Sequence, residues 1–185
     1  MPLPSNSFTF KVPQKGVLRV LQTPCAIGLA FNPLTQAPPP GKPFSAIWDT
    51  GATNSVVSQK VIDECGLTQT GLTEVHGVNS VTMEPTFLVS IQLPSGVGYQ
   101  EVQVTRGTLP HGSDVLIGMD IIVTGDFVIT NKDGVTWWSF CWPSTRRTDY
   151  VAEHQVKAAL GSPTHGGGLH RPKKHKNFGQ AKKHK

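Results

Sequence analysis

The sequence predicts an all-β fold, namely a small closed or nearly closed β-barrel with one or two short helices. Short runs of apolar and β-prone residues recur at regular spacing over the first 143 residues. Turn signals rich in Gly, Pro and Asp separate these runs, and helix signals are few.

Two hairpins are expected near the N-terminus. The runs Phe8–Val12 and Val17–Leu21 are separated by a turn that contains Pro and Gly, and they predict the first hairpin. The runs Cys25–Phe31 and Phe44–Trp48 predict the second. The three prolines from Pro38 to Pro40 lie between this second pair, and we expect a surface loop there because proline cannot donate a ladder hydrogen bond.

The middle of the chain predicts one short helix and three strands. Gln59–Cys65 has helix-compatible spacing of its apolar residues, and Gly66 follows as a stop signal. Two extended runs within Glu74–Leu93 surround a Gly-containing tip and predict a hairpin. Tyr99–Thr105 alternates apolar and polar residues, which indicates a half-buried strand.

Three further strands are expected before residue 143. The apolar run within Asp114–Thr124 predicts a strand buried on both faces. Phe127–Thr130 and Val135–Phe140 predict a hairpin, because an Asp-Gly pair, Asp133-Gly134, stands between them. We expect one face of the last strand to carry Trp138, Phe140 and Trp142.

The two ends of the chain differ in their balance of charged residues. Residues 1–145 hold 7 Lys and Arg against 10 Asp and Glu, whereas residues 146–185 hold 10 against 2. We expect an extension with the first strand over residues 1–14, the barrel domain over 15–143, a short helix within 144–160 with Asp149 as its N-cap, and a disordered basic tail over 161–185.

Cysteines and apolar runs suggest a compartment. Three cysteines far apart argue against a disulfide framework, and they show no metal-ligand spacing. The first residues lack a signal-peptide core, and no run approaches the roughly 20 apolar residues of a membrane span. We therefore expect a cytoplasmic protein that has no membrane partner.

One acidic turn stands out because of its setting. An apolar strand, Phe44–Trp48, leads into Asp49, a turn of small residues follows, and Val56 resumes the extended pattern. A single carboxylate is thereby presented on a loop between two supported strands.

With Asp49-Thr50-Gly51-Ala52 in this setting, the sequence resembles the retropepsin-like aspartic proteases, which are single-lobe relatives of pepsin that act as homodimers. Gly77-Val78-Asn79-Ser80 resembles the flap that covers the substrate in this family. Leu116-Ile117-Gly118 is similar to the second signature of the family. The strands of Phe127–Phe140 fall where the family builds its dimer interface, and the resemblance covers roughly residues 15–143.

The resemblance implies an aspartic endopeptidase that uses no cofactor and no metal. Peptide hydrolysis of this type needs one carboxylate as a base for water and one carboxylic acid. The chain has no second Asp-Thr-Gly or Asp-Ser-Gly, so the second carboxylate is expected from Asp49 of another copy across a two-fold axis. The expected catalytic residues are Asp49, Thr50 and Gly51. The expected substrate-binding residues are Ala52, Gly77, Val78, Asn79, Leu116, Ile117 and Gly118.

Two departures from the retroviral pattern leave the strength of the dimer and the substrate preference open. Met119-Asp120 follows the second signature where retroviral members commonly have Arg-Asn, and Thr53-Asn54 replaces acidic residues after the catalytic loop. The Gly-Met-Asp sequence looks closer to cellular and bacterial members.

The alternative function is a non-catalytic dimeric β-barrel whose basic tail binds nucleic acid or another polyanion.

Overall fold

The computed structural model describes residues 6–11, 16–76, 81–110 and 112–161. The chain separates into two units, residues 1–146 and residues 147–185, which we describe one at a time. The strands of the first unit are β1 (Ser7–Lys11), β2 (Gln22–Leu29), β3 (Lys42–Trp48), β4 (Val56–Val57), β5 (Gln69–His76), β6 (Val81–Gln92), β7 (Gly98–Arg106), β8 (Val115–Ile117), β9 (Asp126–Thr130) and β10 (Trp137–Cys141). Its helices are α1 (Gln59–Cys65), α2 (Met119–Ile122) and the 3-10 turn η1 (Lys132–Gly134).

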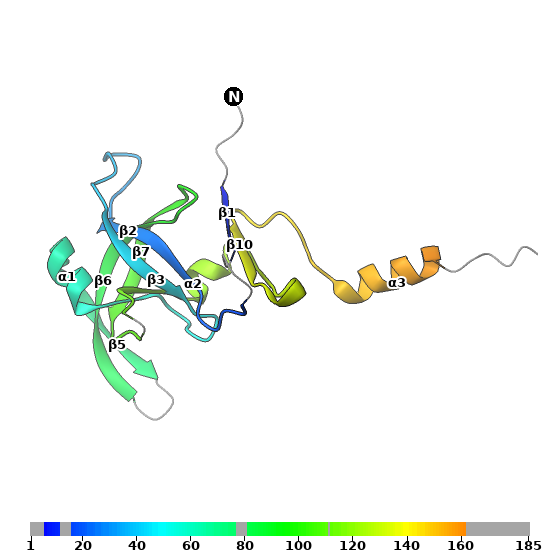
Figure 1. The fold of residues 1–185 in the computed structure, drawn as a ribbon. Coiled ribbons are helices and arrows are strands. Elements are labelled where there is room, and N and C mark those ends of the chain that lie inside the picture. Colours follow the sequence, from blue (N-terminus) through cyan, green and yellow to red (C-terminus); the bar gives the residue numbers. More distant parts are fainter. Residues whose placement is uncertain (1–5, 12–15, 77–80, 111, 162–185) are drawn as a thin grey trace, which may run out of the picture. The chain divides into compact units, whose positions relative to one another are not determined.

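Six strands close into a barrel, which confirms the predicted fold class (Figure 1). The order is β2-β3-β8-β4-β7-β6, and a second pairing between β2 and β6 completes the ring, with β5 added beyond β6. The β3–β8 and β4–β7 pairs are parallel, and the other pairs are antiparallel. Strand β8 thus lies between β3 and β4, and this arrangement sets the geometry of the loop that follows β3.

The barrel interior is filled by aliphatic side chains at alternating strand positions. Ile27, Val89 and Val104 have no exposed surface or almost none, as expected for inward-facing positions of a half-buried strand. Burying each such side chain contributes about 1.5–3 kcal/mol relative to leaving it in water. The predicted strands over Cys25–Phe31, Phe44–Trp48 and Tyr99–Thr105 are confirmed by β2, β3 and β7.

The predicted first hairpin is wrong. Strand β1 pairs with β10, which also pairs with β9, and together these three form a separate sheet. Residues 17–21 form no strand. The reason is aromatic packing: Phe8 on β1 lies against Trp138 of β10 and Trp48 of the barrel, with ring centroids 5.6 and 5.8 Å apart. A local hairpin with residues 17–21 would give up these contacts.

The β9–β10 hairpin is confirmed, with its turn at η1. Asp133 and Gly134 both have positive φ, 58° and 72°, which explains why an Asp-Gly pair occurs there. Trp138 and Phe140 are buried, as predicted for one face of β10. Trp142 lies past the end of the strand and is 40% exposed, so its predicted place on that buried face is wrong.

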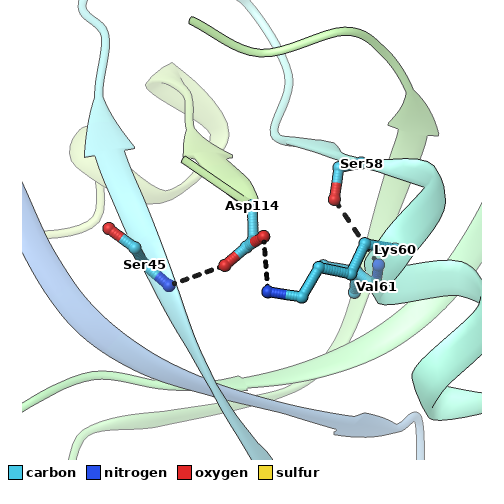
Figure 2. Close-up of polar contacts among 5 residues, drawn as sticks. All are labelled: Ser45, Ser58, Lys60, Val61 and Asp114. Atoms are coloured by element: carbon cyan, nitrogen blue, oxygen red, sulfur yellow. Dashed lines mark hydrogen bonds and ion pairs between the residues drawn. The ribbon is translucent and has the colours of Figure 1, made fainter. Parts of the chain in front are cut away.

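Helix α1 confirms the predicted short helix and its glycine stop. The hydroxyl of Ser58 accepts a hydrogen bond from the backbone N–H of Val61 at 3.5 Å, which caps the first turn (Figure 2). Gly66 ends the helix with φ of 62°, a conformation that glycine adopts without steric cost.

The predicted continuous strand over Asp114–Thr124 is correct only as far as Ile117. Gly118 then turns the chain into α2, where the backbone N–H groups of Ile121 and Ile122 bond to the carbonyl oxygen of Gly118. Ile121 and Ile122 are still buried, because adjacent apolar residues suit a short helix against a core as well as a strand.

The predicted hairpin around residues 77–80 is confirmed in its two strands. His76 of β5 pairs with Val81 of β6, and the antiparallel ladder continues from there to Gln69 and Phe87, with one irregularity beside Gly71. Residues 77–80 at the tip lie outside the described residues.

The second unit contains helix α3 (Tyr150–Gly161). The side chain of Asp149 accepts a hydrogen bond from the N–H of Ala152 at 3.0 Å, which confirms Asp149 as the N-cap. Gly161 was expected to end this helix, but the helix includes it. The predicted disordered tail falls almost entirely on residues 162–185, outside the described part of the chain. Within the described residues, no helix has the length and apolarity needed to cross a membrane.

Candidate active site

The end of strand β3 presents Asp49 on a backbone that is fixed from two sides. The N–H of Trp48 donates to the carbonyl oxygen of Leu21, and the N–H of Asp49 donates to the carbonyl oxygen of Ile117, both at 3.0 Å. Trp48 is buried, Asp49 is half-buried and Thr50 is exposed. The chain therefore leaves the core at Asp49 and brings its carboxylate to the surface.

Gly51 orients the Asp49 carboxylate. Its N–H donates to Asp49 Oδ1 at 2.8 Å, and the N–H of Ala52 donates to the Asp49 carbonyl oxygen at 3.3 Å. A side chain on residue 51 would place its Cβ atom 3.1 Å from Oδ1, tighter than an ordinary contact. Glycine therefore permits the close approach of backbone and carboxylate at this position.

A second turn, at Gly118, supports the loop after Asp49. The N–H of Met119 donates to the carbonyl oxygen of Ala52 at 2.8 Å, and the N–H of Asp120 donates to that of Thr53 at 3.1 Å. A Cβ atom on Gly118 would lie 2.6 Å from the carbonyl group of Asn54. The two chain segments thus pack backbone against backbone, which only glycine allows at this position.

Ser55 and Asp120 join these two segments through their side chains. Asp120 Oδ2 accepts from the N–H of Ser55 at 2.9 Å, and Oδ1 accepts from its hydroxyl at 2.8 Å. The Ser55 oxygen in turn accepts from the N–H of Gly118 at 3.1 Å. Ser55 is fully buried, so this network replaces water for three polar groups next to the loop.

Sequence reasoning did not find the roles of Ser55 and Asp120. In the sequence, Asp120 stood out only as part of a departure from the retroviral pattern. A usable signal was present: Asp120 is the one charged residue inside the otherwise apolar run from Val115 to Val123. A carboxylate that is partly removed from water requires hydrogen-bond donors, and Ser55 of the loop after Asp49 provides them.

The structure brings five of the predicted site residues together, buries two others and leaves the predicted flap residues outside its described ranges. Asp49, Thr50, Gly51, Ala52 and Gly118 form the two facing turns described above. Leu116 is 9% exposed and Ile117 has no exposed surface, so in the single chain Ile117 belongs to the core. The predicted flap residues Gly77, Val78 and Asn79 lie outside the described residues, and their contact with substrate stays a prediction.

No group of three or more His, Cys, Asp or Glu is placed to hold a metal ion anywhere in the described ranges. The polar groups at the Asp49 loop are a carboxylate, backbone N–H groups and the hydroxyl group of Ser55. A half-exposed carboxylate on a rigid loop can accept a proton from a bound water, which is the first half of acid–base hydrolysis.

Comparisons with known proteins identify the same segment. Residues 40–123 match the family model described as "gag-polyprotein putative aspartyl protease". No curated protein sequence matches the chain.

Solved structures include three similar chains, each with a TM-score below 0.5. The EIAV protease complexed with the inhibitor HBY-793 is 18% identical, with a TM-score of 0.41, over 56% of this chain and 86% of that one. A retropepsin-like aspartic protease from Rickettsia conorii is 12% identical, with a TM-score of 0.44, over 76% and 97%. The retroviral protease-like domain of Ddi1 from Leishmania major is 17% identical, with a TM-score of 0.36, over 60% and 82%.

Because these TM-scores are low, the likeness to known proteins depends on the family model and on the segment that it covers. That segment contains the Asp49 loop, the Gly118 turn and the Ser55–Asp120 network that connects them. By this match residues 40–123, rather less than half of the chain, are similar to the aspartyl proteases of the gag-polyprotein family.

Proposed function

We propose that this chain hydrolyses peptide bonds as a homodimer, with Asp49 of each protomer forming one catalytic dyad. The observation that carries the proposal is that Asp49 is half-exposed on a loop held by hydrogen bonds from β8, α2 and its own turn. A carboxylate that served only as a turn residue would not need this degree of support.

The second carboxylate has to come from another copy. In the described part of the chain, the acidic side chain that supports this loop is Asp120, and both of its oxygens already accept hydrogen bonds from Ser55. Two copies related by a two-fold axis through the exposed Thr50–Gly51 turn would place two identical carboxylates side by side. Like charges at such a distance cannot both ionise, so the pair would share one proton.

The reaction then needs only these two groups and a water. The ionised Asp49 takes a proton from the water, whose oxygen attacks the peptide carbonyl carbon while the protonated Asp49 donates to the carbonyl oxygen. Collapse of the tetrahedral intermediate breaks the C–N bond, and a carboxyl group gives its proton to the leaving amine. The hairpin of β5 and β6 is suited to cover an extended substrate, which would add backbone hydrogen bonds as another strand.

The small three-stranded sheet is a suitable dimer surface. Its edges are β1 and β9, and its exposed apolar side chains include Ile129 at 45% and Trp137 at 43%. Exposed apolar surface together with unpaired strand edges favours association with a second copy.

The test compares wild-type protein with Asp49→Asn in a peptidase assay between about pH 4 and 7, and it checks that pepstatin inhibits the wild-type cleavage. The Asn variant keeps the shape of the side chain but cannot act as an acid or a base, so we expect loss of cleavage with an unchanged fold. Cleavage that survives the substitution would refute the proposed chemistry.

A mixing experiment tests the shared dyad separately. Equal amounts of wild type and Asp49→Asn, exchanged to equilibrium, should keep about one quarter of the activity per total protein, because only wild-type pairs contain two carboxylates. Retention of about one half would show that each chain acts alone.

A further inference from the structure

A polar cavity of about 610 Å³ opens at the end of the barrel where α1 begins and β8 starts. It is lined by residues of α1, β6, β7 and the loop that joins β7 to β8. The lining residues used below are Ser58, Lys60, Glu84, Arg106, Thr108 and Asp114. All six of these side chains carry a charge or a hydroxyl group, unlike the aliphatic side chains of the barrel interior.

Asp114 forms the inner wall of this cavity and is held in place. Its Oδ2 accepts from the N–H of Ser45 at 3.3 Å, and its Oδ1 contacts Lys60 Nζ at 3.1 Å (Figure 2). Only 14% of the Asp114 side chain is exposed, compared with 58% of the Lys60 side chain. The carboxylate therefore lies inside, and the ammonium group lies toward the solvent.

The second ion pair of the cavity has the same arrangement. Arg106 Nη2 lies 3.3 Å from Glu84 Oε2. The Arg106 side chain is 47% exposed and that of Glu84 is 23% exposed. In both pairs the anion is the more enclosed partner and the cation is the more exposed one.

The cavity lies close to the catalytic loop along the strands. Val57 of β4 pairs with Arg106 on one side and with Val115, next to Asp114, on the other. Ile117, which binds the backbone of Asp49, is three positions from Asp114, or about 10 Å along an extended strand. An extended peptide covers this distance in about three residues.

We propose that this cavity is a substrate subsite that takes an acidic side chain, Asp or Glu, located two to four residues from the cleaved bond. The inference depends on the proposed peptidase function and adds a substrate preference to it. Lys60 and Arg106 provide the charge, and the Ser58 and Thr108 hydroxyls lie in the same lining. The more enclosed carboxylates of Asp114 and Glu84 hold the two cations in position.

The experiment uses matched fluorogenic peptides that carry Asp or Glu, or the neutral Asn or Gln, at each position two to four residues from the cleaved bond. For wild type we expect kcat/KM to be about fivefold higher for the acidic peptide at one of these positions, since a partly exposed ion pair contributes about 1 kcal/mol. The preference should weaken at high salt.

Substitution of the two cations tests the assignment of the site. In the double variant Lys60→Met and Arg106→Met, the ratio of kcat/KM for acidic and neutral peptides should fall to about one. Lys132→Met is the matched control, because Lys132 lies in η1 and does not line the cavity, and it should keep the full ratio. An unchanged ratio in the double variant overturns the proposal.

Failure of the subsite and failure of the peptidase function give different results. Cleavage by wild type with equal kcat/KM for both peptides overturns the subsite alone. If the wild-type dimer cleaves nothing, the peptidase proposal fails, and binding of the same peptides to Asp49→Asn protein decides the subsite. Acidic peptide should then bind about fivefold more tightly than its neutral counterpart, and equal affinities overturn the proposal.

Discussion

Ser55 and Asp120 are 65 residues apart in the sequence, and Asp120 binds both the backbone and the side chain of Ser55, at 2.9 and 2.8 Å. Ser55 precedes strand β4 and Asp120 lies in the first turn of α2. The pair thus connects the end of the Asp49 loop to the turn at Gly118, and the first prediction concerns its removal.

Ser55→Ala should destabilise the protein and reduce activity. The variant leaves the buried N–H of Gly118 without its partner and removes one of the two hydrogen bonds that Asp120 Oδ1 accepts, which costs about 1–3 kcal/mol. Chemical denaturation measures the loss, and kcat measures the loosening of the loop. Ser95→Ala is the control, because Ser95 binds only the N–H of Val97 in the β6–β7 turn, and it should change neither quantity by a comparable amount.

Gly118→Ala should be more disruptive than a methyl group suggests. The added Cβ atom would lie 2.6 Å from the carbonyl group of Asn54, so one of the two facing turns has to move, at a cost of about 1–3 kcal/mol. We expect a lower Tm together with a lower kcat. Gly98→Ala, where the nearest atom lies 4.0 Å away, should leave both nearly unchanged. Equal effects of the two substitutions would contradict the packing described for Gly118.

Asp126 should control a local pH transition after strand β10. Hydrogen bonds from Ser144 above all, and then from Thr145 and Arg146, lower the pKa of the Asp126 carboxyl to about 2. Since the folded-state pKa is the lower one, these contacts are complete above about pH 4 and are lost as the pH falls toward 2. The amide NMR signals of Thr145 and Arg146 should follow this transition in wild type. Asp126→Asn should abolish it, and an unchanged transition in that variant would assign it to another group.

Cys25 should resist alkylation in the folded protein. Burial, with a smaller contribution from Asp114, raises the pKa of the Cys25 thiol to about 12, and the residue is only 5% exposed. Cys65 and Cys141 are half-buried. Mass spectrometry after iodoacetamide treatment near pH 8 should find label on Cys65 and Cys141 first, and on Cys25 only after denaturation. Early labelling of Cys25 would show that the β2 strand opens locally.

Local signals in the sequence predicted the elements whose causes are local. Helix α1 has its cap at Ser58 and its stop at Gly66, and the β9–β10 hairpin has Asp133-Gly134 at its turn. The Asp49 turn is of the same kind, because Gly51 lies only two residues after the carboxylate that it orients. Within such short segments, conformational preference and hydrogen bonding can be read from neighbouring residues.

Pairing over long distances was not predictable in this way. Strand β1 pairs with β10 because Phe8 and Trp138 pack together, and no turn signal near Phe8 indicates a partner about 130 residues away. Helix α2 replaces a predicted strand because its first N–H groups bond to Ala52 and Thr53. Short apolar runs suit either structure, and tertiary contacts select one of them.

The sequence by itself determined the class of fold and the position of the Asp49 turn, since each follows from residues close together in the chain. Only the tertiary structure decided what holds that turn. Ser55, Gly118 and Asp120 meet because β8 lies between β3 and β4. The buried hydrogen bonds that make the loop rigid exist only after the barrel has excluded water from them.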